Sequence, residues 1–157
     1  MTETLPPPLL EHVCDLAVTI APPIEIGQTA SGLRRVIPIT GGVVTGPRLR
    51  GKVLAAGADF QLILGGGTQA HLDARYVIEL DDGTRVFVQN TALRFASLEN
   101  SQRIMRGEPV NPADIYFRCQ PRLEAVGEKW AWLAESQFVG SGRRAPDGVF
   151  LSFYRVC

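Results

Sequence analysis

Hydrophobic and polar residues alternate in short runs along most of this chain, a pattern that predicts β-strands. The clearest runs are HLDARYVIEL (residues 71–80) and TRVFVQN (residues 84–90), which are joined through Asp82-Gly83. That dipeptide is favoured in two-residue type I′ turns, because glycine tolerates the positive φ that such turns require. We therefore expect a β-hairpin here.

Similar runs predict further strands at residues 11–20, 33–39, 48–54, 59–64, 115–120, 130–139 and 149–156. Pro22 and Pro23 end the first of them, and Pro38 is expected at an edge or a bulge because it has no N–H to donate. Strands of this length and spacing, without alternating helices, predict an all-β fold of about eight to nine antiparallel strands in a barrel or sandwich.

One helix is expected, at residues 97–106. Ser97 is suited to cap its first turn, and Gly107 is suited to the left-handed conformation that follows a helix. The chain has 157 residues and no internal repeat, so we expect a single domain over 1–157, with residues 1–10 as a flexible N-terminal extension.

Composition excludes several classes of protein. The chain is 45% hydrophobic and 20% charged, which is typical of a globular protein, and its formal net charge of zero provides no basic surface for nucleic acid. It has no run of 18 apolar residues and no basic, apolar leader at its N-terminus, so we expect neither a membrane span nor secretion but a cytoplasmic protein.

Cysteine and histidine usage gives little support for a metal site. Cys14, Cys119 and Cys157 are odd in number and far apart, which predicts free thiols. His12 and Cys14 share one face of the first predicted strand, but the only other histidine is His71, so we expect no metal. No nucleophile elbow, phosphate-binding loop or zinc-protease motif occurs, and we expect no cofactor. The doublets at 34–35 and 143–144 are interpreted as solvated or paired arginines.

Charged residues occupy one face of several predicted strands. Asp73 and Arg75 alternate with apolar residues, and Tyr116 and Arg118 do the same further along the chain. In a sandwich such a face lies in solvent, whereas in a small closed barrel it can line the lumen. Alternation alone is compatible with both placements of these charged faces.

Three further features are candidates for a site. Asp59 precedes Phe60 at the start of a predicted strand, where it is either a turn residue or a carboxyl group in the lumen with a raised pKa. Glu124 continues the polar spacing beyond Arg118. Trp130 and Trp132 share a strand face, as core residues or as the wall of an apolar pocket.

Four segments, taken in order, resemble one family: GLRRVIPITGGVVTGPRLRGKVLAAGADF, LDARYVIELDDGTRVFVQN, EPVNPADIYFRCQPRLE and WAWLAESQFVGSGRR. It is the family known as domain of unknown function 3237, and the resemblance extends from about Leu10 to the C-terminus. It implies a single antiparallel β-barrel similar to lipocalin-like or allene-oxide-cyclase-like barrels. A barrel of that size has a lumen large enough for side chains or one small ligand.

On that fold the leading hypothesis is a cofactor-independent isomerase, cyclase, hydratase or lyase. It moves a proton on a small oxygenated aromatic or unsaturated metabolite in the lumen. The expected catalytic residues are Asp59, Glu124 and Tyr116, and the expected substrate-binding residues are Arg75, Arg118, Asp73, Trp130 and Trp132. Guanidinium groups are suited to a ligand carboxylate or enolate.

Two alternatives use the same residues. The protein is a non-catalytic lipocalin-like carrier of a small hydrophobic acid, or its charges form a structural ion network in which Arg118→Ala costs several kcal/mol. Outward-facing Ile78, Leu80, Val86 and Val88 would need a covering surface, which predicts a homo-oligomer, a dimer by default and a trimer by analogy with related barrels.

Overall fold

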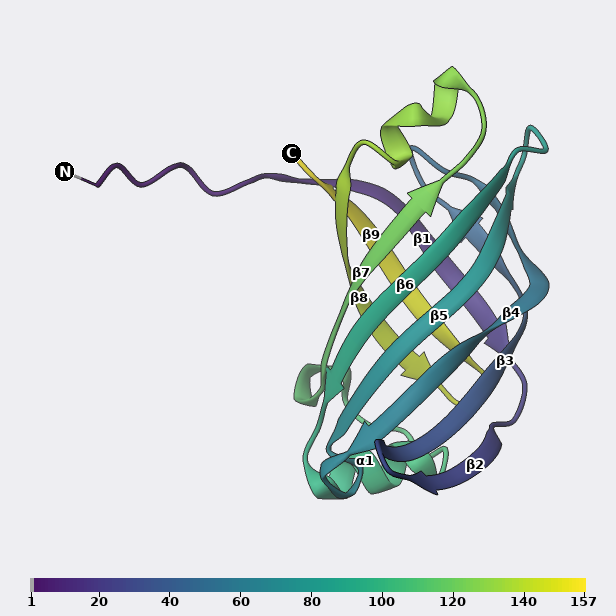
Figure 1. The fold of residues 1–157 in the computed structure, drawn as a ribbon, viewed down its shortest axis with the longest axis vertical. Coiled ribbons are helices and arrows are strands. Elements are labelled where there is room, and N and C mark those ends of the chain that lie inside the picture. Colours follow the sequence, from purple (N-terminus) through teal and green to yellow (C-terminus); the bar gives the residue numbers. More distant parts are fainter. Residues whose placement is uncertain (1) are drawn as a thin grey trace.

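The strands of this protein close into a barrel. A computed structural model describes residues 2–157. Its strands are β1 (Leu10–Ile20), β2 (Ile24–Thr29), β3 (Gly32–Thr45), β4 (Gly51–Leu64), β5 (Gln69–Leu80), β6 (Arg85–Phe95), β7 (Tyr116–Glu124), β8 (Gln137–Ala145) and β9 (Gly148–Val156). Neighbouring strands run antiparallel in the order β1-β9-β8-β7-β6-β5-β4-β3, and pairing of β3 with β1 closes the ring (Figure 1). The predicted all-β barrel is confirmed.

The strand β2 lies outside this ring and was not predicted. It pairs with the first residues of β3, while the later residues of β3 pair with β1. The β3 strand is long enough to serve both partners, so β2 extends the wall at one end of the barrel (Figure 1). Residues 2–9 form no helix or strand, and the extended N-terminal segment leads away from the barrel in the same view.

The β5–β6 hairpin is confirmed, but its turn differs from the prediction. The N–H of Gly83 donates to the carbonyl of Leu80 at 2.8 Å, and the N–H of Leu80 donates to the carbonyl of Thr84 at 2.8 Å. Only glycines have positive φ within residues 2–157, and Gly83 has φ of 86°. A type I′ turn needs positive φ at two central residues. The loop is therefore a three-residue connection that ends in left-handed Gly83.

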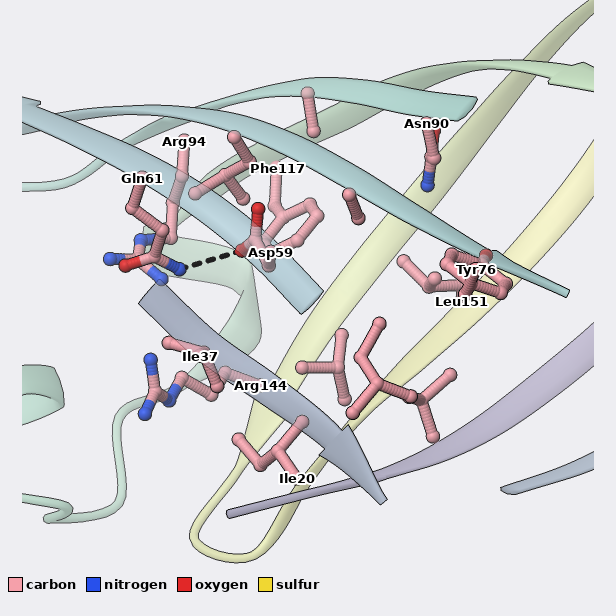
Figure 2. A pocket seen from close by; sticks show the side chains of 16 residues that line it. Ile20, Ile37, Asp59, Gln61, Tyr76, Asn90, Arg94, Phe117, Arg144 and Leu151 are labelled. Carbon is pink, nitrogen blue, oxygen red and sulfur yellow. Dashed lines mark hydrogen bonds between the residues drawn. The ribbon is translucent and has the colours of Figure 1, made fainter. Parts of the chain in front are cut away.

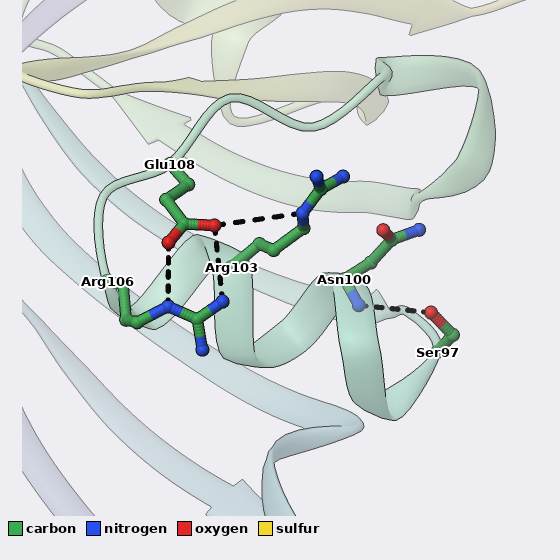
Figure 3. Close-up of polar contacts among 5 residues, drawn as sticks. All are labelled: Ser97, Asn100, Arg103, Arg106 and Glu108. Atoms are coloured by element: carbon green, nitrogen blue, oxygen red, sulfur yellow. Dashed lines mark hydrogen bonds and ion pairs between the residues drawn. The ribbon is translucent and has the colours of Figure 1, made fainter.

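The predicted helix is confirmed as α1 (Leu98–Met105), with Ser97 accepting a hydrogen bond from the N–H of Asn100 at 3.1 Å. Gly107 follows it with φ of 75°. Figure 3 shows Arg106 donating to Glu108, with Nε and Oε1 2.8 Å apart, and Arg103 beside the same carboxylate. The helix lies at the same end of the barrel as β2 (Figure 1). Among residues 2–157, no helix is long and apolar enough to cross a membrane.

The strand predicted over residues 130–139 is wrong in its first half. Residues Glu128–Leu133 form a 3-10 helix, η3, and β8 begins only at Gln137. Gly127 has φ of 100°, which turns the chain after β7. Leu133 is buried in the core, whereas the two tryptophans are only partly buried around it. Their two-residue spacing therefore reflects a tight helical turn, not a strand face.

The two short strands predicted around residue 56 form one strand, β4. Its register with β5 passes from Val53–Ile78 to Gly57–Tyr76, so β4 contains a bulge of two extra residues. Gly57 has φ of +141°, and a Cβ there would lie 2.2 Å from the carbonyl oxygen of Arg75. Only glycine permits this close approach. Beyond the bulge, Asp59 lies opposite Ala74 and faces the interior.

The apolar face of each strand forms the core. Ile78, Val86 and Val88 have no exposed area, and Leu80 is also buried. The interpretation that these four residues cover the outside is wrong, because barrel closure turns the apolar face inward. They give no argument for a partner subunit, and the homo-oligomer remains a prediction.

Candidate functional site

A cavity occupies the lumen, and all eight barrel strands contribute to its wall. It contains about 620 Å³ of atom-free space, including its open mouth. Its lining is mainly aliphatic, with Phe117 as an aromatic member. The polar side chains that line it are Asp59, Gln61, Tyr76, Asn90, Arg94 and Arg144. This composition, apolar with few polar groups, is typical of small-molecule sites.

Asp59 is held at both of its carboxylate oxygens. Oδ2 accepts a hydrogen bond from Nε2 of Gln61 at 2.7 Å (Figure 2), and Oδ1 accepts one from the backbone N–H of Asp73 at 3.1 Å. Gln61 in turn accepts a hydrogen bond at Oε1 from Nε of Arg35, also at 2.7 Å. The two hydrogen bonds from Arg35 to Gln61 and from Gln61 to Asp59 fix the orientation of the carboxyl group.

Burial raises the pKa of Asp59 above its ordinary value of 3.8. The hydrogen bonds from Gln61 and the Asp73 backbone, and the charges of Arg94 and Arg35, oppose this rise without cancelling it. A buried carboxyl group with a raised pKa is a candidate general acid or base.

The charges of three arginines interact with this one carboxyl group: Arg35, Arg94 and Arg144. Burial, together with repulsion from the other two arginines, lowers the pKa of Arg94 to about 10. Arg35 forms a long ion pair with exposed Glu25, in which Nη1 of Arg35 and Oε1 of Glu25 are 3.9 Å apart. Within residues 2–157 no carboxylate lies within 4.0 Å of Arg94 or Arg144. With Asp59 ionised, the cluster keeps an excess of positive charge.

Of the residues predicted for the site, only Asp59 lines the cavity. Asp73 and Arg75 lie on the outer face of β5, where they form an ion pair at 3.7 Å. Their neighbours Leu72 and Ala74 line the lumen instead. The interpretation in which the charged face of β5 lines the lumen is wrong, because burying the apolar face is more favourable than burying charges.

The same alternation removes three residues of β7 from the lumen. Tyr116, Arg118 and Glu124 are exposed, while Phe117 and Cys119 between them are buried. Their predicted placement in the barrel is therefore wrong.

The two tryptophans also lie away from the cavity lining. Nε1 of Trp130 donates to the hydroxyl of Thr84 at 3.2 Å, and the guanidinium of Arg48 lies 4.3 Å from the ring centre of Trp132. The two tryptophans belong to η3, which lies at the opposite end of the barrel from α1 (Figure 1).

Sequence reasoning missed most of the polar lumen. Arg35 and Arg144 belong to the doublets interpreted as solvated or paired. By alternation, Arg34 and Arg143 are the outward-facing members, while Arg35 is buried and bonded to Gln61. Arg94 follows Ala92 on an inward face. The available signal was a polar side chain on an otherwise apolar face, which is rare unless that side chain has a role. It identifies Gln61, Tyr76, Asn90 and the three arginines.

Replacing Arg118 by alanine is expected to change the free energy of unfolding by less than about 0.5 kcal/mol, as for other exposed side chains. Its Nη1 donates only to the carbonyl of neighbouring Phe117, at 2.9 Å, and its guanidinium lies 5.5 Å from the ring centre of Tyr116. Urea denaturation of both proteins checks this prediction. A decrease of several kcal/mol in the free energy of unfolding would instead support a structural ion network around Arg118.

His12 and Cys14 do not share a face. A bulge in β1 separates them, so that Cys14 is fully buried and His12 lies near the surface, 3.1 Å from Asp15. In residues 2–157, no three His, Cys, Asp or Glu side chains are grouped as metal ligands. Cys14 and Cys119 are buried free thiols as predicted, while Cys157 is free and exposed.

Comparison with known proteins places the chain in a family. The family model described as "Protein of unknown function (DUF3237)" matches residues 8–156. A UPF0311 protein of Bradyrhizobium diazoefficiens is 43% identical over 156 residues, which cover 99% of each chain. The crystal structure of a conserved protein of unknown function from Rhodopseudomonas palustris superposes with a TM-score of 0.91 at 38% identity, covering 98% of this chain and 100% of that one.

A more distant structure, described as an enzyme from Penicillium herquei, has a TM-score of 0.73 at 19% identity over the full length of both chains. At that identity the similarity concerns the fold alone. The whole-length family match and the close relatives agree with the barrel described above, and the chain therefore belongs to the DUF3237 family.

Proposed function

We propose that this protein binds a small, mainly apolar anion in its barrel and moves a proton on it without a cofactor, as an isomerase, cyclase, hydratase or lyase. The observation that carries the proposal is the single carboxyl group with a raised pKa, Asp59, which lines an apolar cavity together with Arg94 and Arg144. The two kinds of group supply the two parts of such a reaction.

The arginines supply the anion site. Buried guanidinium groups without a counter-ion are unfavourable, and a ligand carboxylate, enolate or phenolate offsets this cost by bidentate hydrogen bonding. Arg94 and Arg144 have no close carboxylate among the described residues and line the cavity, so they are the groups available to the ligand.

Asp59 supplies the proton transfer. Its ionised carboxylate accepts a proton from a carbon next to a carbonyl group of the ligand, and the electron pair of the broken C–H bond moves onto the carbonyl oxygen. The guanidinium groups stabilise the enolate that results. Return of the same proton to another carbon completes an isomerisation, with Asp59 restored.

A second function has support from the same cavity. A non-catalytic carrier of a small hydrophobic acid needs the aliphatic lining and the arginines but no proton transfer. The fate of the bound ligand distinguishes the two functions, because only the enzyme exchanges its carbon-bound hydrogens or converts it.

The test is a thermal-shift screen of small aromatic, enone and aliphatic acids, each paired with its methyl ester. We expect acids to raise the melting temperature and esters to have little effect, since the ester lacks the negative charge. Acids that bind are then incubated in D₂O and followed by NMR for deuterium incorporation or product.

The Arg118→Ala protein is the control, because it lacks a guanidinium on the outer face. Acids that bind but never exchange or react would assign the protein as a carrier. Equal effects of acids and esters would contradict the anion site itself.

A further inference from the structure

Two buried polar groups in the cavity lie outside the cluster of Asp59, Gln61 and the arginines. The hydroxyl of Tyr76 and Oδ1 of Asn90 have no hydrogen-bond partner within residues 2–157, although both side chains are at least 96% buried, with 3% and 4% of their area exposed. An unpaired buried polar group lowers the stability of the fold, and phenylalanine would fill the position of Tyr76 without that loss. Neither group has a role in the Asp59 network.

The strand register places these groups relative to the catalytic carboxyl. Asp59, Ala74 and Asn90 are successive partners across β4, β5 and β6. With strands about 4.8 Å apart, the Asp59 and Asn90 backbones are about 10 Å apart. Tyr76 follows Ala74 on the same face of β5, on the side away from α1. Figure 2 shows Tyr76 and Asn90 on one side of the cavity, and Gln61, Arg94 and Arg144 on the other.

Small side chains separate the two polar regions. Ala74 lies between Asp59 and Asn90 in the register, and Ala92 lies between Asn90 and Arg94 along the inward face of β6. The cavity wall between the two polar regions is therefore formed by small apolar side chains. These leave room for the flat apolar part of a ligand.

We infer that the ligand carries a second oxygen-bearing group, a hydroxyl or carbonyl, at the end remote from its anion, and that Tyr76 and Asn90 bind it. The inference rests on the proposed anion site. A phenolic hydroxyl and a primary amide both donate and accept hydrogen bonds, so together they satisfy a ligand hydroxyl completely. The substrate class is therefore a hydroxylated aromatic or unsaturated acid long enough to span the two polar regions.

The test measures dissociation constants by calorimetry for matched acids with and without a hydroxyl. The probes are 4-hydroxycinnamate with cinnamate, 6-hydroxy-2-naphthoate with 2-naphthoate, and the methyl esters of the hydroxy acids. They are titrated into the wild type, Tyr76→Phe and, as the matched control, Tyr116→Phe, which removes a hydroxyl from the exposed outer face.

In the wild type and in Tyr116→Phe, we expect the hydroxy acid of at least one pair to bind 10-fold or more tightly than its partner. In Tyr76→Phe that preference is expected to fall below threefold, while the acid without a hydroxyl binds as before. The melting temperature of Tyr76→Phe without ligand should be unchanged or higher, because an unpaired hydroxyl is removed.

Equal binding of the paired acids to the wild type, or a preference that survives in Tyr76→Phe, would overturn the inference but leave the anion site intact. Esters that bind as tightly as the acids would overturn the proposed function as well. Absence of binding by all of these probes would overturn both.

Discussion

The Asp59→Asn protein is expected to bind its anionic ligand at least as tightly as the wild type but to convert it roughly 10²–10⁴-fold more slowly, the usual contribution of a general acid or base. Asparagine retains one oxygen, which can accept the hydrogen bond from Gln61 or the one from the Asp73 backbone, but not both. It cannot accept the substrate proton, and it leaves more positive charge for the anion.

Single-turnover deuterium exchange, followed by NMR on any acid that binds, measures this effect. Asp73→Asn is the matched control, because the Asp73 side chain lies on the outer face and only its backbone N–H contacts Asp59. Undiminished exchange in Asp59→Asn would remove Asp59 from the mechanism and favour the carrier function.

The raised pKa of Asp59 also has a consequence for stability. Because the folded state holds this proton more tightly than the unfolded chain, Asp59 contributes stability that is fully present below the unfolded pKa of about 3.9. That contribution is lost as pH rises through the raised pKa of the folded state. The wild type and Asp59→Asn should be denatured at several pH values between 3.5 and 7. We expect the free energy of unfolding of the wild type to fall relative to that of Asp59→Asn as the pH rises.

Arg94→Met is expected to weaken binding of the acid by about 100-fold and, in the absence of ligand, to stabilise the fold by about 1–3 kcal/mol. The affinity loss follows from removing a desolvated, charged hydrogen-bond donor. The gain in stability follows because burial disfavours the charged guanidinium, as its lowered pKa of about 10 indicates, while methionine fills a similar volume without charge. Functional sites often lower the stability of a protein when no ligand is bound.

Calorimetry and urea denaturation together check this prediction. Arg85→Met on the same strand is the control, since Arg85 is exposed and forms a surface ion pair with Glu79. A loss of stability in Arg94→Met, with little change in affinity, would assign the arginines to a structural ion network with Asp59.

Much of the fold was predictable because its signals are local. Alternation identified most strands, the Asp82-Gly83 dipeptide located the hairpin, and Ser97 and Gly107 bounded the helix. The errors arose where local signals are ambiguous. A 3-10 turn and a strand both accommodate the Trp130–Trp132 spacing, and β2 follows two prolines that indicated only an end to β1.

The sequence by itself determined that this is an all-β protein with strands of two distinct faces, and it identified Asp59 as a candidate acid or base. Only the tertiary structure decided which residues surround that carboxyl group. Arg35, Arg94 and Arg144 belong to β3, β6 and β8, which are far apart in the sequence, and barrel closure brings them to one end of the lumen. Alternation assigns a residue to a face, but which polar residues remain on the buried face together depends on strand order, register and bulges, and these are set by contacts between distant segments.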